Sequence, residues 1–210
     1  MLGKVLVLNG SPHVSGCTAT ALGEVIKTLN GEGIETELFQ IGKEKIRGCV
    51  ACNSCRESGK CIFNDKVNEV ATKLQSADGL IVGSPVYYAG PNATVLAFLD
   101  RLFYSTMKMD KTMKVAAAVV NCRRGGNTAS FDRLNKYFAM SCMPIVTSSY
   151  WNQTHGFTSE DVKKDLEGLQ TMRNLGRNMA FLIKAISAEK KKNGLPNIET
   201  KYFTSFPDGK

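Results

Sequence analysis

The fold of this chain is decided by the segment Lys4-Val5-Leu6-Val7-Leu8-Asn9-Gly10-Ser11-Pro12-His13-Val14-Ser15-Gly16-Cys17-Thr18. Its first part is a short aliphatic run, which predicts a strand, and its second part is a loop that leads into a helical pattern. Glycines allow a tight turn, and hydroxyls together with the free N–H groups of a helix N-terminus bind anions. The loop matches neither the Walker motif nor the Gly-x-Gly-x-x-Gly motif, so it favours a monophosphate. A polar turn that only caps a helix is the alternative.

The rest of the chain continues the alternation of strand and helix patterns, which indicates an α/β protein with a parallel sheet. We predict strands at residues 4–9, 35–40, 79–84, 115–121 and 144–148. A final long helix is expected from Thr158 or Ser159 to about Ala188. Five strands connected in this way predict a doubly wound five-stranded sheet of order 2-1-3-4-5 in three layers. The ligand crevice then lies at the carboxyl ends of the first and third strands.

The composition of the chain predicts one globular domain without a membrane span. It has 210 residues, of which 43% are hydrophobic and 22% charged. We assign residues 1–190 to the domain, residues 42–66 to a cysteine-rich insertion loop and residues 191–210 to a tail. The first apolar run is too short for a signal peptide, so we expect a cytoplasmic protein. The net charge is +8, but the basic residues are spread out and no nucleic-acid motif occurs, so no nucleic-acid partner is expected.

Two later loops have the composition of a site for a flat aromatic ring. Residues 84–90 read Ser-Pro-Val-Tyr-Tyr-Ala-Gly after the third predicted strand, and residues 121–127 read Asn-Cys-Arg-Arg-Gly-Gly-Asn after the fourth. Tyrosines offer aromatic surface, and backbone amides with an arginine can bind the polar edge of a ring. The alternative is that these tyrosines are core residues and the arginines solvated surface charges.

Several of these segments resemble the NAD(P)H-dependent FMN reductase and iron–sulfur flavoprotein family. The resemblance spans about residues 4–186 and is carried by Gly10-Ser11-Pro12, Gly16-Cys17-Thr18, residues 83–91, Phe98-Leu99-Asp100-Arg101, Tyr150-Trp151-Asn152 and His155-Gly156. In that family the first loop usually reads Gly-Ser-Pro-Arg…Gly-Asn-Thr, so this chain has His13 in place of Arg and Cys17 in place of Asn.

The resemblance implies a flavodoxin-like fold that binds FMN in the predicted crevice. The residues that we expect to contact FMN are Ser11, His13, Ser15, Cys17, Thr18, Pro85, Val86, Tyr87, Tyr88, Gly90, Asn121, Cys122, Arg123, Arg124, Gly125 and Gly126. Cys17 would contribute its backbone N–H. The arginines would stabilise the negative charge of the reduced ring and so favour two-electron chemistry.

Four cysteines lie close together in the insertion loop. Cys49, Cys52, Cys55 and Cys61 are spaced at three, three and six residues, and seven cysteines in total are not typical of a disulfide framework. Compact spacing of this kind can place four thiolates around one centre. It matches the motif of the iron–sulfur flavoproteins, in which four cysteines hold a 4Fe-4S cluster near the flavin. Zinc, or free or oxidised thiols, are alternatives.

The leading functional hypothesis is an FMN-dependent oxidoreductase. It would transfer electrons from NADH or NADPH to a quinone, a free flavin, a nitro- or azo-aromatic compound or a protein acceptor. His155 is a candidate proton donor, although a lone histidine often has a structural role. The alternatives are an iron–sulfur flavoprotein electron carrier reduced by ferredoxin, and a zinc-binding regulatory module without flavin. Since the relatives usually form dimers or tetramers, we expect a homodimer or homotetramer, in which residues 202–206 either pack or are disordered.

Overall fold

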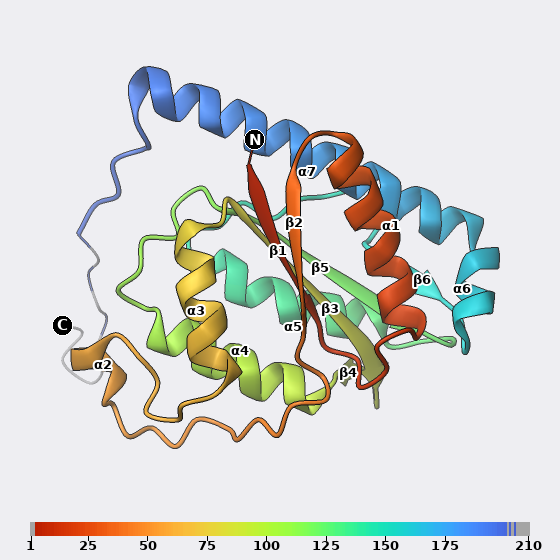
Figure 1. Cartoon of the computed structure of the whole chain (residues 1–210), viewed down its shortest axis with the longest axis horizontal. Coiled ribbons are helices and arrows are strands. Elements are labelled where there is room, and N and C mark those ends of the chain that lie inside the picture. The colour runs from red at the N-terminus through yellow and green to blue at the C-terminus, as the bar shows by residue number, and fades with distance from the viewer. Residues whose placement is uncertain (1–2, 201, 203, 205–210) are drawn as a thin grey trace.

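A computed structural model describes residues 3–200, 202 and 204 of the chain, and its centre is a parallel sheet (Figure 1). The parallel strands are β1 (Lys4–Asn9), β2 (Glu35–Gln40), β3 (Gly79–Tyr87), β5 (Val115–Cys122) and β6 (Gln153–His155). The two residues of β4 (Gly90–Pro91) form an antiparallel hairpin with the end of β3. The order β2-β1-β3-β5-β6 confirms the predicted doubly wound arrangement.

Helices cover both faces of the sheet and complete the three predicted layers (Figure 1). The helices are α1 (Cys17–Gly31), α2 (Cys55–Ser58), α3 (Lys66–Ser76), α4 (Ala93–Ser105), α5 (Asn127–Ala139), α6 (Ser159–Lys164) and α7 (Leu166–Asn193). α1 and α7 pack on one face, and α3, α4 and α5 pack on the other. None of the helices in the described residues has the length and apolar character that a membrane crossing requires.

Successive side chains along each strand point to opposite faces of the sheet and pack into two separate hydrophobic cores. In β1, Val5 and Val7 pack against α1 and α7, whereas Leu6 and Leu8 pack against α3 and α4. All four side chains are fully buried. A strand buried on both faces reads as a continuous apolar run, which is why β1 and β5 were predictable from sequence.

The fifth strand of the sheet lies later in the chain than predicted. At the predicted position, residues 144–148, only an isolated bridge between Ile145 and Ala116 forms. The strand β6 instead uses Gln153–His155, which pair in parallel with residues 120–122 of β5. The side chain of Asn121 adds hydrogen bonds to the carbonyl oxygen of Thr154 at 3.1 Å and to its hydroxyl at 3.0 Å. Residues 153–155 therefore belong to the sheet itself and do not follow it.

The predicted long terminal helix is two helices separated at Asp165. Thr158 caps α6 and exchanges reciprocal hydrogen bonds with Asp161, as expected for a capping box. At Asp165 the backbone leaves the helical region, and the carboxylate accepts hydrogen bonds from Gly168 N at 2.9 Å and from His155 N at 2.7 Å. The second helix continues to Asn193, beyond the predicted end. Of the tail segment 202–206, Tyr202 is exposed, and residues 203, 205 and 206 lie outside the described part.

Candidate functional site

The loop after β1 is fixed by its own hydrogen bonds. The side chain of Asn9 accepts from Ser11 N at 3.0 Å, and the hydroxyl of Ser11 accepts from His13 N at 3.1 Å. A Cβ atom on Gly10 would lie 2.0 Å from the side chain of Val95, so only glycine fits there. The loop is therefore shaped before any ligand arrives, and the Ser11 hydroxyl accepts one bond while keeping its own proton to donate.

The N-terminus of α1 lacks the side-chain cap that most other helices have. Side chains cap α3, α4, α6 and α7, but Gly16 caps α1 with backbone alone and no acidic residue stands in the first turn. The Thr18 hydroxyl in this turn is buried without a hydrogen-bond partner. Free N–H groups and an unpartnered hydroxyl at the positive end of a helix dipole are suited to an anion such as phosphate.

The other predicted phosphate contacts have different surroundings. His13 and Ser15 are exposed beside this helix end. The thiol of Cys17 points instead to the carbonyl oxygen of Gly156 at 3.6 Å, and burial raises its pKa above the usual value. The group that Cys17 can offer to a phosphate is therefore its backbone N–H.

The hairpin between β3 and β4 carries the two predicted ring-binding tyrosines on a strained turn. Tyr88 and Ala89 both have positive φ, at 49° and 59°, which is the signature of a type I′ turn normally built from glycine and asparagine. Tyr87 is about half exposed and Tyr88 is fully exposed. Pro85 and Val86 are partly buried, and Gly90 closes the hairpin opposite Tyr87. Strained turns that expose aromatic side chains are common at ligand sites.

The loop after β5 packs directly on this hairpin. Gly126 has a φ of 93°, and a Cβ atom there would lie 2.7 Å from the Cα of Ala89. Arg123, Arg124 and Gly125 are exposed beside it. Gly126 also starts α5 without a side-chain cap or an acidic residue in the first turn. Two uncapped helix ends thus lie at the carboxyl edge of the sheet.

Two further predicted contacts use their side chains within the fold. Asn121 binds Thr154 across the sheet, and the Cys122 thiol donates to the side-chain oxygen of Asn127 at 2.6 Å. Burial raises the pKa of Cys122, so this thiol is neutral near pH 7. The side-chain nitrogen of Asn121 and the thiol of Cys122 are therefore already engaged within the fold.

His155 lies at the end of β6 with its ring exposed. Its Nδ1 is 3.7 Å from a carboxylate oxygen of Asp165, and both residues border a cavity of about 220 Å³. Tyr150 and Gln153 also line this cavity, and the rings of Tyr150 and Trp151 are 4.8 Å apart. Gly156, the next residue, donates to the carbonyl oxygen of Cys122 at 3.0 Å. The loop that follows β6 therefore lies at the same edge of the sheet as the loops after β1, β3 and β5.

The cysteine segment folds around a cavity of its own. All four predicted ligands line this cavity, together with side chains from α4. Ala51 and Asn53 have left-handed backbone conformations, with φ of 52° and 60°, and so curl the chain on both sides of Cys52. Within the described residues, no three His, Cys, Asp or Glu side chains stand close enough to hold a metal ion as they are placed.

The thiols of this cavity differ in their surroundings. Hydrogen bonds from Ser54 hold the pKa of Cys52 below its usual value, whereas partial burial raises the pKa of Cys55. The cavity adjoins Tyr104 at the C-terminal end of α4, and the loops described above surround its N-terminal end. From Thr94 to Tyr104 the helix rises by about 15 Å. The loops predicted to contact FMN and the four cysteines therefore lie at opposite ends of α4.

Comparison with known proteins gives these two regions a context. Residues 3–157 match the family model described as NADPH-dependent FMN reductase. The chain belongs to this family. The assignment makes it an FMN-binding oxidoreductase.

One relative and two solved structures show what this member of the FMN reductase family is similar to. An iron-sulfur flavoprotein of Methanocaldococcus jannaschii is 35% identical over 190 residues, covering 87% of this chain and 98% of that protein. RosB bound to 8-demethyl-8-formylriboflavin-5'-phosphate has a TM-score of 0.69 at 14% identity, covering 97% of this chain and 92% of RosB. A WrbA-like flavodoxin from Agrobacterium tumefaciens has a TM-score of 0.59 at 17% identity, covering 87% and 98%. The structural likenesses establish the flavodoxin-like fold.

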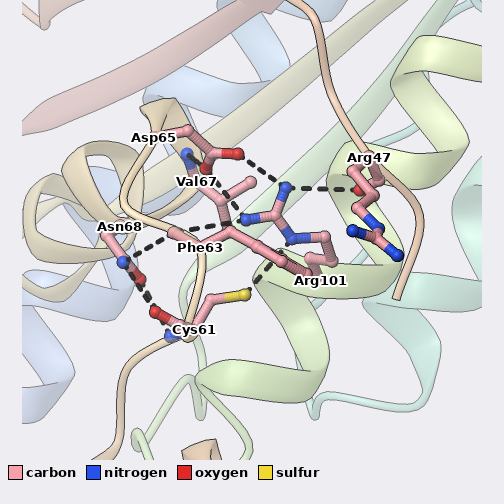
Figure 2. A network of polar contacts seen from close by, with 7 residues as sticks. All are labelled: Arg47, Cys61, Phe63, Asp65, Val67, Asn68 and Arg101. Carbon is pink, nitrogen blue, oxygen red and sulfur yellow. Dashed lines mark hydrogen bonds and ion pairs between the residues drawn. The ribbon is translucent and has the colours of Figure 1, made fainter. Parts of the chain in front are cut away.

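The structure of this FMN reductase family member also reveals a residue to which sequence reasoning gave no role. Arg101 of α4 is buried, forms a two-pronged ion pair with Asp65 at 2.7 and 2.9 Å, and donates from Nε to Cys61 Sγ at 3.2 Å (Figure 2). A signal was present, because Arg101 occupies the buried stripe of α4 between Phe98 and Ser105. A charge in such a position requires a buried partner.

Proposed function

We propose that this protein binds FMN at the carboxyl edge of the sheet and uses it to pass electrons from NADH or NADPH to a second acceptor. The observation that carries the proposal is the uncapped N-terminus of α1, where a buried Thr18 hydroxyl has no partner within the fold. A phosphate at this position would receive the free backbone N–H groups and the hydroxyls of Thr18 and Ser11. FMN carries a monophosphate of this kind.

The ring of FMN would lie between the hairpin and the loop after β5. Tyr87 and Tyr88 supply exposed aromatic surface, and the backbone of residues 122–126 faces the same edge. FMN, when bound, supplies the two-electron chemistry at its ring. Arg123 and Arg124 place positive charge beside it, which stabilises the electron-rich reduced form. The chain thus contributes position and electrostatics.

Turnover by the flavin-loaded protein tests which electron donor and which electron acceptor it uses. We expect loss of the flavin absorbance on anaerobic addition of NADH or NADPH, and its return when a quinone, free flavin, nitro-aromatic or azo-aromatic compound is added. His155→Ala tests the proposed proton donor in the same assay, and unchanged turnover would remove that role. If neither nicotinamide is oxidised with any of these acceptors, the reductase proposal fails.

The cysteine segment is proposed to hold a 4Fe-4S cluster through Cys49, Cys52, Cys55 and Cys61. Four thiols around one cavity provide the donor set of such a cluster, and the Methanocaldococcus jannaschii relative is named an iron-sulfur flavoprotein. A bound cluster would supply one-electron chemistry. Iron and acid-labile sulfide analysis of anaerobically purified protein tests this, with about four irons per chain expected. Zinc in place of iron, or no metal with free thiols, would contradict it.

A second function, that of an electron carrier reduced by ferredoxin, is favoured by the same cavity. A one-electron centre in a protein that also binds FMN converts single electrons into pairs, and the net charge of +8 attracts acidic partners. Rapid reduction by reduced ferredoxin with negligible NADH or NADPH oxidation would favour the carrier over the reductase. The rate should fall steeply as salt is added.

The assembly and location belong to the same proposal. We infer a cytoplasmic homodimer or homotetramer. The assembly is supported by exposed aromatic side chains at the carboxyl edge, among them Tyr88, Trp151 and Phe157. Light scattering of the FMN-loaded protein measures the mass directly. A mass of one chain at micromolar concentration would refute the assembly.

A further inference from the structure

We propose that Arg101 is a positioning residue of the cysteine centre, which fixes Cys61 and raises the reduction potential of the cluster bound there. This inference rests on the proposed 4Fe-4S cluster. It concerns a side chain that does not line the FMN crevice and that would act through the sulfur of Cys61.

The N–H groups of the Arg101 guanidinium all donate to residues of the cysteine-rich loop 42–66 (Figure 2). Besides its two bonds to Asp65, it donates to the carbonyl oxygens of Arg47 at 3.3 Å and Phe63 at 3.4 Å, and to Cys61 Sγ at 3.2 Å. These contacts account for the five N–H groups of an arginine. The side chain is about 1% exposed, so water does not compete for them.

Cys61 is also held through its backbone. Its N–H donates to the side-chain oxygen of Asn68 at 2.9 Å, and its carbonyl oxygen accepts from the side-chain nitrogen of Asn68 at 2.9 Å. Asp65, the ion-pair partner of Arg101, caps α3 by accepting from Val67 N at 3.1 Å. Cys61 is thus fixed to α3 by its backbone and to α4 by its sulfur.

The other three cysteines lack an arginine contact of this kind in the described residues. Cys49 and Cys52 are exposed, and Cys55 is partly exposed in the short α2. Cys61 is therefore the thiol that a buried arginine supports, whereas Cys49 and Cys52 lie on a curled loop and Cys55 begins the short α2. A rigid ligand supported by hydrogen bonds from its neighbours is the usual way in which a protein controls a metal centre.

The positive charge of Arg101 affects how readily the proposed cluster accepts an electron. Reduction adds one negative charge to a cluster and its thiolates, and a buried cation that donates to a ligand sulfur stabilises that added charge. The carboxylate of Asp65 offsets part of the positive charge of Arg101. The Nε–H group of Arg101 still points at the sulfur of Cys61 and can stabilise negative charge there. The predicted effect is a higher midpoint potential than the same cluster would have without this bond.

The experiment is a spectroelectrochemical titration of the anaerobically purified, FMN-loaded protein, with iron content and thermal midpoint measured on each sample. Arg101→Lys keeps a positive charge but loses the Nε–H that reaches Cys61. Arg101→Gln combined with Asp65→Asn removes both charges and leaves no lone ion. Arg133→Lys is the control, since Arg133 is an arginine of α5 that pairs loosely with Asp100 at 3.8 Å away from the cavity.

The proposal is supported if both Arg101 variants keep their iron and the cluster potential shifts lower, while the flavin potential and the control do not move. An unchanged cluster potential overturns it. Loss of iron together with flavin and a large fall of the thermal midpoint also overturns it, because Arg101 is then merely structural. Iron absent from the unmodified protein overturns it along with the cluster, whereas retained FMN turnover in that sample leaves the reductase function standing.

Discussion

The unpartnered hydroxyl of Thr18 gives the sharpest test of the flavin site, because one substitution should move two measured quantities in opposite directions. Thr18→Val replaces the hydroxyl by a methyl group of nearly the same shape. The hydroxyl is buried and unpaired in the fold as it stands, a state that costs free energy. Without FMN the variant should therefore be as stable as the unmodified protein, or more stable by about 1 kcal/mol.

With FMN bound as proposed, the same change removes a hydrogen bond to a charged phosphate. Such bonds contribute about 1.5–3 kcal/mol, which corresponds to roughly 10- to 150-fold weaker binding. FMN fluorescence quenching measures the affinity, and urea unfolding of the flavin-free protein measures the stability. Thr28→Val is the matched control, since Thr28 lies in the same helix and its hydroxyl donates to the carbonyl oxygen of Glu24 at 2.9 Å, far from the N-terminus.

The reasoning is refuted if Thr18→Val binds FMN as tightly as the unmodified protein does. It is also refuted if the flavin-free variant is strongly destabilised, because the affinity loss would then report a damaged fold. The control should keep its affinity, with a small loss of stability from the missing bond to Glu24. Only the pattern of weaker FMN binding without loss of stability identifies the hydroxyl as a phosphate ligand.

Four further predictions concern the fold and the ring site. Gly10→Ala should destabilise the protein by about 1–3 kcal/mol in urea unfolding, since its Cβ would meet Val95 at 2.0 Å. Gly23→Ala, where a Cβ meets no atom within 4 Å, should stabilise it by roughly 0.5–1 kcal/mol. Tyr88→Ala should leave stability within about 0.5 kcal/mol, because the side chain is fully exposed, and should weaken FMN binding by about 0.5–1.5 kcal/mol in a fluorescence titration. Burial lowers the pKa of Lys111 from 10.5 to about 8, so the penalty for its charge is complete below pH 8 and is relieved as the pH rises toward 10.5. The thermal midpoint of the unmodified protein minus that of Lys111→Met should therefore increase between pH 8 and pH 10, and a constant difference would contradict the assignment.

The strands buried on both faces were predictable because their own residues determine them. The aliphatic run of β1 and the Val- and Ala-rich β5 have no other stable place in a domain of this size. The three residues of β6 contain no such run, and Thr154 is held by a side chain from a strand that lies more than thirty residues earlier. A contact so distant in sequence leaves no local pattern.

The same distinction separates the site residues that were predicted from those that were missed. Gly10 and Thr18 belong to a loop whose spacing is visible in the sequence, so an anion site could be proposed there before the structure was known. The type I′ turn at Tyr88 and Ala89 has none of the usual Asn-Gly signals and is stabilised by Gly126 from another loop. The break at Asp165 combines a local N-cap bond from Gly168 N with a bond from His155 N of β6, and the second of these has no counterpart in the helical pattern.

Because the cysteine cavity lies at the far end of α4 from the proposed FMN site, the two cofactors should be removable independently of each other. No residue that lines the cavity belongs to the loops around the N-terminus of α1. If the cavity holds the proposed cluster, air exposure or a chelator that removes it should leave a yellow protein, and dialysis that withdraws the flavin should leave the metal behind. The visible spectrum can then be divided into two additive parts, each recorded on a sample that lacks the other chromophore.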